Sequence, residues 1–166
     1  MIKLDYMREM IYTPNEVPSH LLATGEYLGF RFYVLNIDGS HPTAYVRLDK
    51  THPLYCIEYG EADKYVPGVH CGFTYGSSTL DGVPDDGNSW FLGWDYGHCC
   101  DFMGYYLKKP EDYLATHSHK WITAEIIHEV STVCEILNII RKTGLLTEYS
   151  TEAEGGDKNE QAGSKD

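Results

Sequence analysis

The hydrophobic positions in the first two thirds of the chain follow no helical period. Residues 27–36 and 43–48 are rich in aromatic and β-branched side chains, which favour strands. Residues 37–40, Ile-Asp-Gly-Ser, have turn chemistry and predict that these two strands form an antiparallel hairpin. A Gly-, Asp- and Pro-rich segment at 76–89 predicts a loop. The complete set of predicted strands is 27–36, 43–48, 69–75 and 90–95.

A helical period begins only after residue 122. Thr123 is the expected N-cap, Glu125 places a carboxylate in the first turn, and Gly144 is the expected end. Hydrophobic residues recur at alternating spacings of four and three, which predicts one apolar stripe along the helix. The stripe consists of Ile126, Val130, Val133, Leu137 and Ile140.

These patterns predict an α+β fold: a mainly antiparallel sheet with one long C-terminal helix packed on one face. Residues 150–166 contain no large apolar side chain, so we expect a disordered acidic tail there. Residues 1–149 are then a single α+β domain. A short helix is expected to begin within 97–106.

Charge and hydropathy limit the classes of function. The 166 residues carry a formal net charge of −12, which argues against direct binding to nucleic acid. No stretch approaches the ~20 apolar residues of a membrane-spanning helix. Residues 1–10 lack the apolar core of a signal peptide, so a cytoplasmic protein is expected.

The negative charge is concentrated in the middle of the chain. Between residues 51 and 107 there are eight acidic residues and one basic residue, Lys64, which gives −7. Such a segment is either a solvated surface or a face that binds cations or a basic protein partner. The candidate partner-binding residues are Glu58, Glu61, Asp63, Asp81, Asp85 and Asp86.

Histidines and carboxylates near the predicted strand ends form a candidate metal site. Asp95, His98 and Asp101 are spaced three residues apart, and a neighbouring strand could deliver His70 to the same place. Nitrogen and oxygen ligands of this kind suit Zn²⁺, with Mn²⁺ or Fe²⁺ as alternatives. The predicted metal ligands are therefore His70, Asp95, His98 and Asp101.

Ordinary packing is the alternative interpretation of the same residues. Asp95 could cap the following turn, Asp101 could form a local ion pair, and His98 could be a half-buried histidine. His117 and His119 could form a second metal patch or face water.

The cysteines do not suggest a finger-type zinc site. The sequence contains no Cys-x-x-Cys pair. Cys134 lies on the helical stripe and is expected in the core, and adjacent Cys99 and Cys100 are expected to be small buried residues.

Three segments make the chain similar to a family of small phage and prophage proteins. They are His41-Pro-Thr-Ala-Tyr-Val46, His70-Cys-Gly-Phe-Thr-Tyr75 and the run from Trp90 to Asp101. The corresponding motifs of the family are His-Pro-x-x-Tyr-Val, His-Gly-Gly-Leu-Thr-Tyr and Trp-hydrophobic-Gly-Phe-Asp-x-Ala-His-x-Gly-Asp. The match covers roughly residues 28–106. Cys71 and Cys100 replace glycines of the pattern.

Size, acidity and the candidate metal site also resemble a zinc-containing anti-CRISPR protein that acts on a type II-A Cas9. This resemblance implies a stoichiometric inhibitor, not an enzyme, that obstructs the loading of target DNA in the host bacterial cytosol. The alternative is a metal-dependent hydrolase of a nucleotide or phosphoester, with Asp101 or Glu58 as general base. An acidic α+β protein without any metal is the third interpretation.

Overall fold

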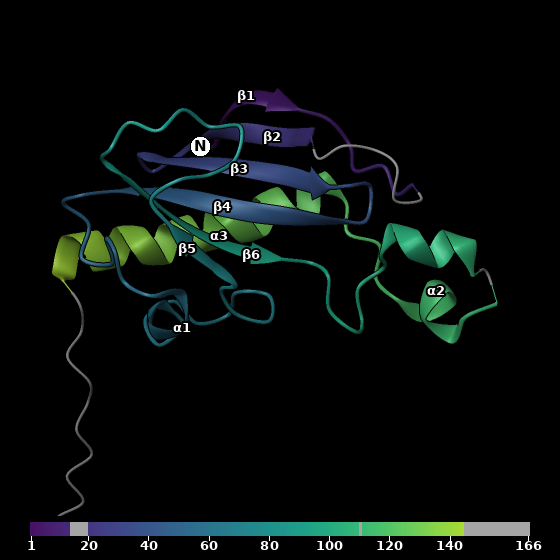
Figure 1. Cartoon of the computed structure of the whole chain (residues 1–166). Helices are drawn as coiled ribbons and strands as arrows, with labels where there is room; N and C mark the ends of the chain where they lie inside the picture. The colour runs from purple at the N-terminus through teal and green to yellow at the C-terminus, as the bar shows by residue number, and fades with distance from the viewer. Residues whose placement is uncertain (14–19, 110, 145–166) are drawn as a thin grey trace, which may run out of the picture.

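The fold is a six-stranded antiparallel sheet with a long helix across one face (Figure 1). The computed structural model describes residues 1–13, 20–109 and 111–144, so the predicted tail at 150–166 lies outside the described residues. The strands are β1 (Lys3–Met7), β2 (His20–Tyr27), β3 (Phe30–Ile37), β4 (His41–Asp49), β5 (Tyr75–Ser77) and β6 (Ser89–Asp95), in the order β1-β2-β3-β4-β6-β5.

The central hairpin of the sheet agrees with the sequence. β3 pairs antiparallel with β4 from Phe32–Val46 to Ile37–His41, and the turn between them places Asp38 and Gly39 at positive φ. Buried and half-buried residues alternate along β3, as expected for a strand covered on one face. The α+β prediction is confirmed.

One local prediction is wrong and another holds only at the end of its range, and both concern the segments around the candidate site. Residues 69–72 form a turn instead of a strand, because Cys71 and Gly72 both adopt positive φ, and β5 begins only at Tyr75. Residues 97–103 form turns and one isolated bridge, so the short helix expected within 97–106 begins only near the end of that range. The first helical turn after β6 is the 3₁₀ helix η1 (Gly104–Lys108).

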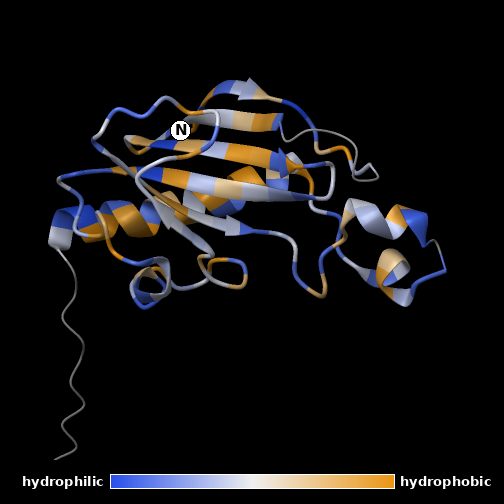
Figure 2. Ribbon diagram, in the orientation of Figure 1, coloured by the Kyte–Doolittle hydropathy of each residue, from blue (hydrophilic) through white to orange (hydrophobic). Residues whose placement is uncertain are grey.

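The helix α3 (Thr123–Thr143) supplies one side of the main core. It lies along β2, β3 and β4, and Figure 2 shows its hydrophobic and hydrophilic residues alternating along the ribbon. All five residues of the predicted stripe are buried, and so is Cys134, whose pKa is raised to about 12 by burial. The N-cap is Ile122 instead of Thr123, and the Glu125 side chain accepts the Ile122 N–H.

His52 fixes the loop after β4 to this helix. Its Nε2–H donates to the Leu137 carbonyl at 3.0 Å, and its Nδ1 accepts the Leu54 N–H at 3.1 Å. The ring is buried, and this burial lowers the pKa of His52. Arg141 lowers it further, while Asp49 and the Leu137 carbonyl act in the opposite direction. His52 is therefore held as a neutral ring.

The opposite face of the sheet is partly covered by the loop between β5 and β6. Leu80 and Val83 of this loop pack on Tyr45 and Phe91. Two short helices complete the described chain, α1 (Tyr59–Ala62) beside β5 and α2 (Tyr113–His117) after η1 (Figure 1). In the part of the chain that the structure describes, no helix is long and apolar enough to cross a membrane.

Candidate metal centre

Two turns bring the predicted histidines together. His70 lies in the turn 69–72, and His98 lies in the turn that follows β6. Their ring centroids are 5.4 Å apart. Asp101 lies between them, and its Oδ2 is 2.9 Å from His70 Nε2 and 3.3 Å from His98 Nδ1. Adjacent ligand atoms of a tetrahedral zinc site with ~2.05 Å bonds lie about 3.3 Å apart, so this spacing suits a shared ion.

Cys71 adds a fourth donor that sequence reasoning missed. Its Sγ is 3.9 Å from His70 Nε2, and ligand atoms of His70, Cys71 and His98 all lie within 4.8 Å of one another. The positive φ of Cys71 (53°) belongs to the turn that presents this sulfur beside the imidazole. The only signal in the sequence is a cysteine next to a candidate histidine ligand. This cluster of side chains could hold a metal ion.

The geometry distinguishes a metal site from a nucleophilic triad. In a Cys-His-Asp triad the carboxylate and the thiol face different ring nitrogens. Here Cys71 Sγ and Asp101 Oδ2 both approach Nε2 of His70. Donor atoms gathered on the same side of a ring are what ligation of a cation requires, whereas a triad needs its thiol and its carboxylate on opposite ring nitrogens.

Asp101 is fixed before any ion binds. Its Oδ1 accepts Trp121 Nε1–H at 2.7 Å, and its Oδ2 accepts the His98 N–H at 2.9 Å. Its side chain is 2% exposed. Burial alone would raise the pKa of Asp101, but the hydrogen bonds from Trp121, His70 and His98 together lower it. The carboxylate is thus held in its charged form.

A second buried network fixes the backbone of His70. Glu129 of α3 accepts the His70 N–H at 2.6 Å and the Tyr96 hydroxyl at 2.8 Å. Tyr96 in turn accepts Trp94 Nε1–H at 2.9 Å, and its ring stacks on His70 with centroids 5.0 Å apart. Burial and the Glu129 carboxylate raise the pKa of Tyr96, so its hydroxyl remains a donor. The helix therefore positions the first histidine.

Asp95 occupies a different position from the other three predicted ligands. Its Oδ1 accepts the Gly97 N–H at 2.9 Å, and its Oδ2 accepts the Thr74 hydroxyl at 2.8 Å. The nearest approach to a histidine is 3.9 Å, from Oδ1 to His98 Nδ1. Asp95 thus joins the end of β6 to the segment before β5, and it borders the cluster of donor atoms.

The six predicted partner-binding acids fall into two groups, and most of them have local hydrogen bonds. In the first group, Glu58 caps α1, Glu61 pairs with Lys64 at 2.6 Å, and Asp63 accepts the Phe73 N–H at 2.7 Å.

The second group lies on the loop between β5 and β6, where Asp81 and Asp85 are exposed. Asp86 in this loop pairs with Arg47 and caps the Asn88 N–H.

The other cysteine and histidine candidates lie outside the cluster. Cys99 and Cys100 are exposed, so the prediction that they are buried is wrong, and their Sγ atoms are 3.7 Å apart. His117 stacks on the Tyr113 ring, whereas His119 lies 3.2 Å from Glu125. Among the described residues, the one group with metal-site spacing contains neither His117 nor His119.

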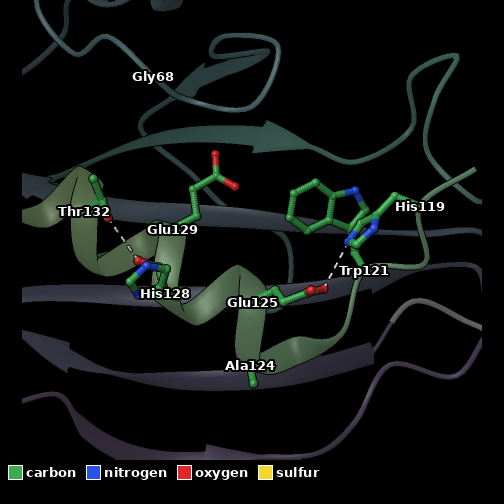
Figure 3. Close-up of a pocket in the computed structure, with 8 residues that line it drawn as sticks. All are labelled: Gly68, His119, Trp121, Ala124, Glu125, His128, Glu129 and Thr132. Carbon is green, nitrogen blue, oxygen red and sulfur yellow. Dashed lines mark hydrogen bonds and ion pairs between the residues drawn. The ribbon is translucent and has the colours of Figure 1, made fainter.

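A groove of about 710 Å³ runs along the first half of α3 (Figure 3). Trp121 and Glu129 line it, and both also hydrogen-bond to the centre. None of His70, Cys71, His98 and Asp101 is among the lining residues. The groove and the candidate ligands are therefore neighbours separated by Trp121 and Glu129.

No protein-family model, curated protein or solved structure matches this chain.

Proposed function

We propose that this chain is an acidic binding protein whose shape is fixed by a structural Zn²⁺ ion. Two observations carry the proposal: ligand atoms of His70, Cys71 and His98 all lie within 4.8 Å of one another, and Asp101 Oδ2 lies 2.9 Å from His70 Nε2 and 3.3 Å from His98 Nδ1. Bound zinc would cross-link the turn of His70 to the turn of His98, and its binding energy would add to the folding free energy.

The donor set favours zinc over Mn²⁺ and Fe²⁺. Two imidazoles, one carboxylate and one thiolate combine nitrogen, oxygen and sulfur, and a thiolate selects against the harder cations. Cys71 is therefore the residue that distinguishes these ions.

The same arrangement supports a structural role over hydrolysis. With Asp101 as the fourth ligand beside His70, Cys71 and His98, a tetrahedral site would be filled, whereas catalytic zinc keeps one position for water. The groove that could hold a substrate is separated from the ligand atoms by Trp121 and Glu129. Glu58, one of the two candidate bases, instead caps α1.

Metal analysis with a matched pair of cysteine variants tests the centre. Purified chain should retain about one zinc per molecule, and Co²⁺ substitution should give sulfur-to-cobalt charge-transfer absorption. Cys71→Ser should remove this absorption. Cys56→Ser is the control, because Cys56 is also exposed and at positive φ but lies outside the cluster. Absence of bound metal, or an unchanged spectrum in Cys71→Ser, would contradict the proposed site.

We propose Cas9 of a type II-A system as the partner. The support is the net charge of −12, the exposed Asp81 and Asp85, and the resemblance described above. Leu80 and Val83 anchor the loop that carries these acids, so little ordering entropy would be lost on binding. Cas9 holds its heteroduplex in a positively charged channel, for which an acidic protein would compete with DNA.

A cleavage assay with purified Cas9, guide RNA and target DNA tests this partner. Inhibition should saturate near one molecule of the chain per Cas9, and DNA binding should be lost together with cleavage. The double variant Asp81→Asn/Asp85→Asn should weaken inhibition while leaving the thermal unfolding temperature unchanged. Full cleavage at a large molar excess of the chain would exclude Cas9 and leave the metal centre untouched.

A further inference from the structure

The groove beside the centre has the chemistry of a site for a cationic side chain. Its lining residues, as far as the structure describes them, include two carboxylates, Glu125 and Glu129, and neither lysine nor arginine. In Figure 3 the Glu129 carboxylate points from α3 toward the segment of Gly68, with the Trp121 indole beside it. The complete lining is Gly68, His119, Trp121, Ala124, Glu125, His128, Glu129 and Thr132.

The two carboxylates have different accessibilities. Glu129 is half-buried and already accepts two hydrogen bonds, so it contributes fixed negative charge to the floor of the groove. Glu125 is 42% exposed, and its partner His119 is 52% exposed. Glu125 is therefore the carboxylate that an incoming ligand can reach.

Trp121 supplies an aromatic surface next to this charge. Its ring contacts His119 with centroids 4.6 Å apart, and its Nε1–H is held by Asp101. The neighbouring Lys120 does not neutralise the groove, because its Nζ lies over the Phe102 ring, 4.5 Å from the centroid. An indole beside two carboxylates binds guanidinium well, because this flat cation can stack on the ring and donate to a carboxylate at the same time.

The size of the groove indicates a peptide instead of a single small amine. From Ala124 to Thr132 the helix rises about 12 Å at ~1.5 Å per residue. Small residues leave space along this length, and a Cβ added at Gly68 would meet nothing within 4 Å. A volume of about 710 Å³ exceeds what one side chain fills.

From these features we infer that the groove binds an arginine-bearing segment of a basic protein partner, with Glu125 and Trp121 as its main contacts. The inference builds on the proposed function, since it names a chemical group through which a basic partner would be recognised. It adds a second contact surface, apart from the acidic loop between β5 and β6.

A titration with short synthetic peptides tests the groove without Cas9. The zinc-loaded chain is titrated with a blocked peptide containing two arginines, with its lysine counterpart and with a glutamate counterpart. Nuclear magnetic resonance follows the indole N–H signals of Trp90, Trp94 and Trp121. The arginine peptide should shift the Trp121 signal selectively and bind several-fold more tightly than the lysine peptide, while the glutamate peptide should not bind.

Two variants on α3 separate the groove from diffuse attraction. Glu125→Gln should weaken binding of the arginine peptide about tenfold. Glu135→Gln removes the same charge from an exposed position outside the groove and keeps an acceptor for the Tyr27 hydroxyl, so it should change binding less than twofold. Equal weakening by both variants, no shift at Trp121, or no binding at all would overturn the inference.

The result also distinguishes this inference from the proposed partner. Cas9 inhibition without peptide binding would refute the groove alone. Selective binding at Trp121 without Cas9 inhibition would refute that partner and support a different arginine-bearing one.

Discussion

Replacement of Asp101 by asparagine tests whether this carboxylate is both a buried hydrogen-bond acceptor and a metal ligand. Its two oxygens accept separate donors, Trp121 Nε1–H and the His98 N–H. Asparagine has one acceptor oxygen and one NH₂ group. Whichever way the amide turns, one of the two donors therefore faces another donor.

The expected cost has a metal-independent part and a metal-dependent part. Leaving one buried donor without an acceptor costs about 1–3 kcal/mol, and this loss should appear with the metal chelated. When the free metal concentration is held constant above the dissociation constant, each tenfold loss of metal affinity lowers the stability of the folded chain by a further ~1.4 kcal/mol. Loss of outer-shell partners alone weakens metal sites ~10- to 100-fold, so loss of the Asp101 ligand should add at least ~1.4 kcal/mol.

Urea unfolding with chelator and with buffered Zn²⁺ separates the two parts. Asp95→Asn is the comparison variant, because both Asp95 oxygens also accept hydrogen bonds, from the Gly97 N–H and the Thr74 hydroxyl. It should lose less stability, because asparagine can accept the Gly97 N–H through its amide oxygen and donate its NH₂ group to the Thr74 hydroxyl oxygen, and the loss should depend less on zinc. If Asp101→Asn destabilises the chain equally with and without Zn²⁺, Asp101 is not a ligand and the reasoning fails.

Two further predictions concern the fold. Burial lowers the pKa of His52 in the folded chain below the unfolded value of about 6.5. Between these two pKa values only the unfolded ring takes up a proton, so the contribution of neutral His52 to stability is complete above about pH 6.5 and decreases as the pH falls. The stability advantage of wild type over His52→Gln should therefore shrink between pH 7 and pH 5 in urea unfolding, and a constant difference would contradict it. Gly104→Ala should lower the free energy of unfolding by about 1–3 kcal/mol or more, because the added Cβ would overlap the Gly39 carbonyl oxygen. Gly60→Ala should not destabilise the short helix α1 in which it lies. Equal unfolding midpoints for the two variants would contradict this.

The elements found from sequence are those with strong local signals. The helix α3 combines a regular apolar period with a carboxylate in its first turn, and the β3–β4 hairpin combines strand formers with Asp38 and Gly39 in its turn. His98 and Asp101 lie three residues apart in one turn, so their proximity is also local.

What the sequence does not reveal depends on contacts between distant segments. In β2, Gly25 weakens the strand pattern, yet it allows β1 to approach, because a Cβ there would overlap the Lys3 carbonyl oxygen. Cys71 adopts positive φ, a conformation that non-glycine residues rarely show and that sequence does not mark. Trp121 and Glu129 reach the centre only because α3 folds back beside it.

The outer strand β1 limits how the sheet can extend. Its five residues are all exposed, including the apolar Leu4, Tyr6 and Met7, while β5 at the other border has three residues. An unpaired border of this kind can recruit a strand from another molecule, and charged side chains such as Lys3 and Asp5 oppose such growth. Neutralising Lys3 or Asp5 would therefore remove one of the features that oppose the addition of a foreign strand along β1.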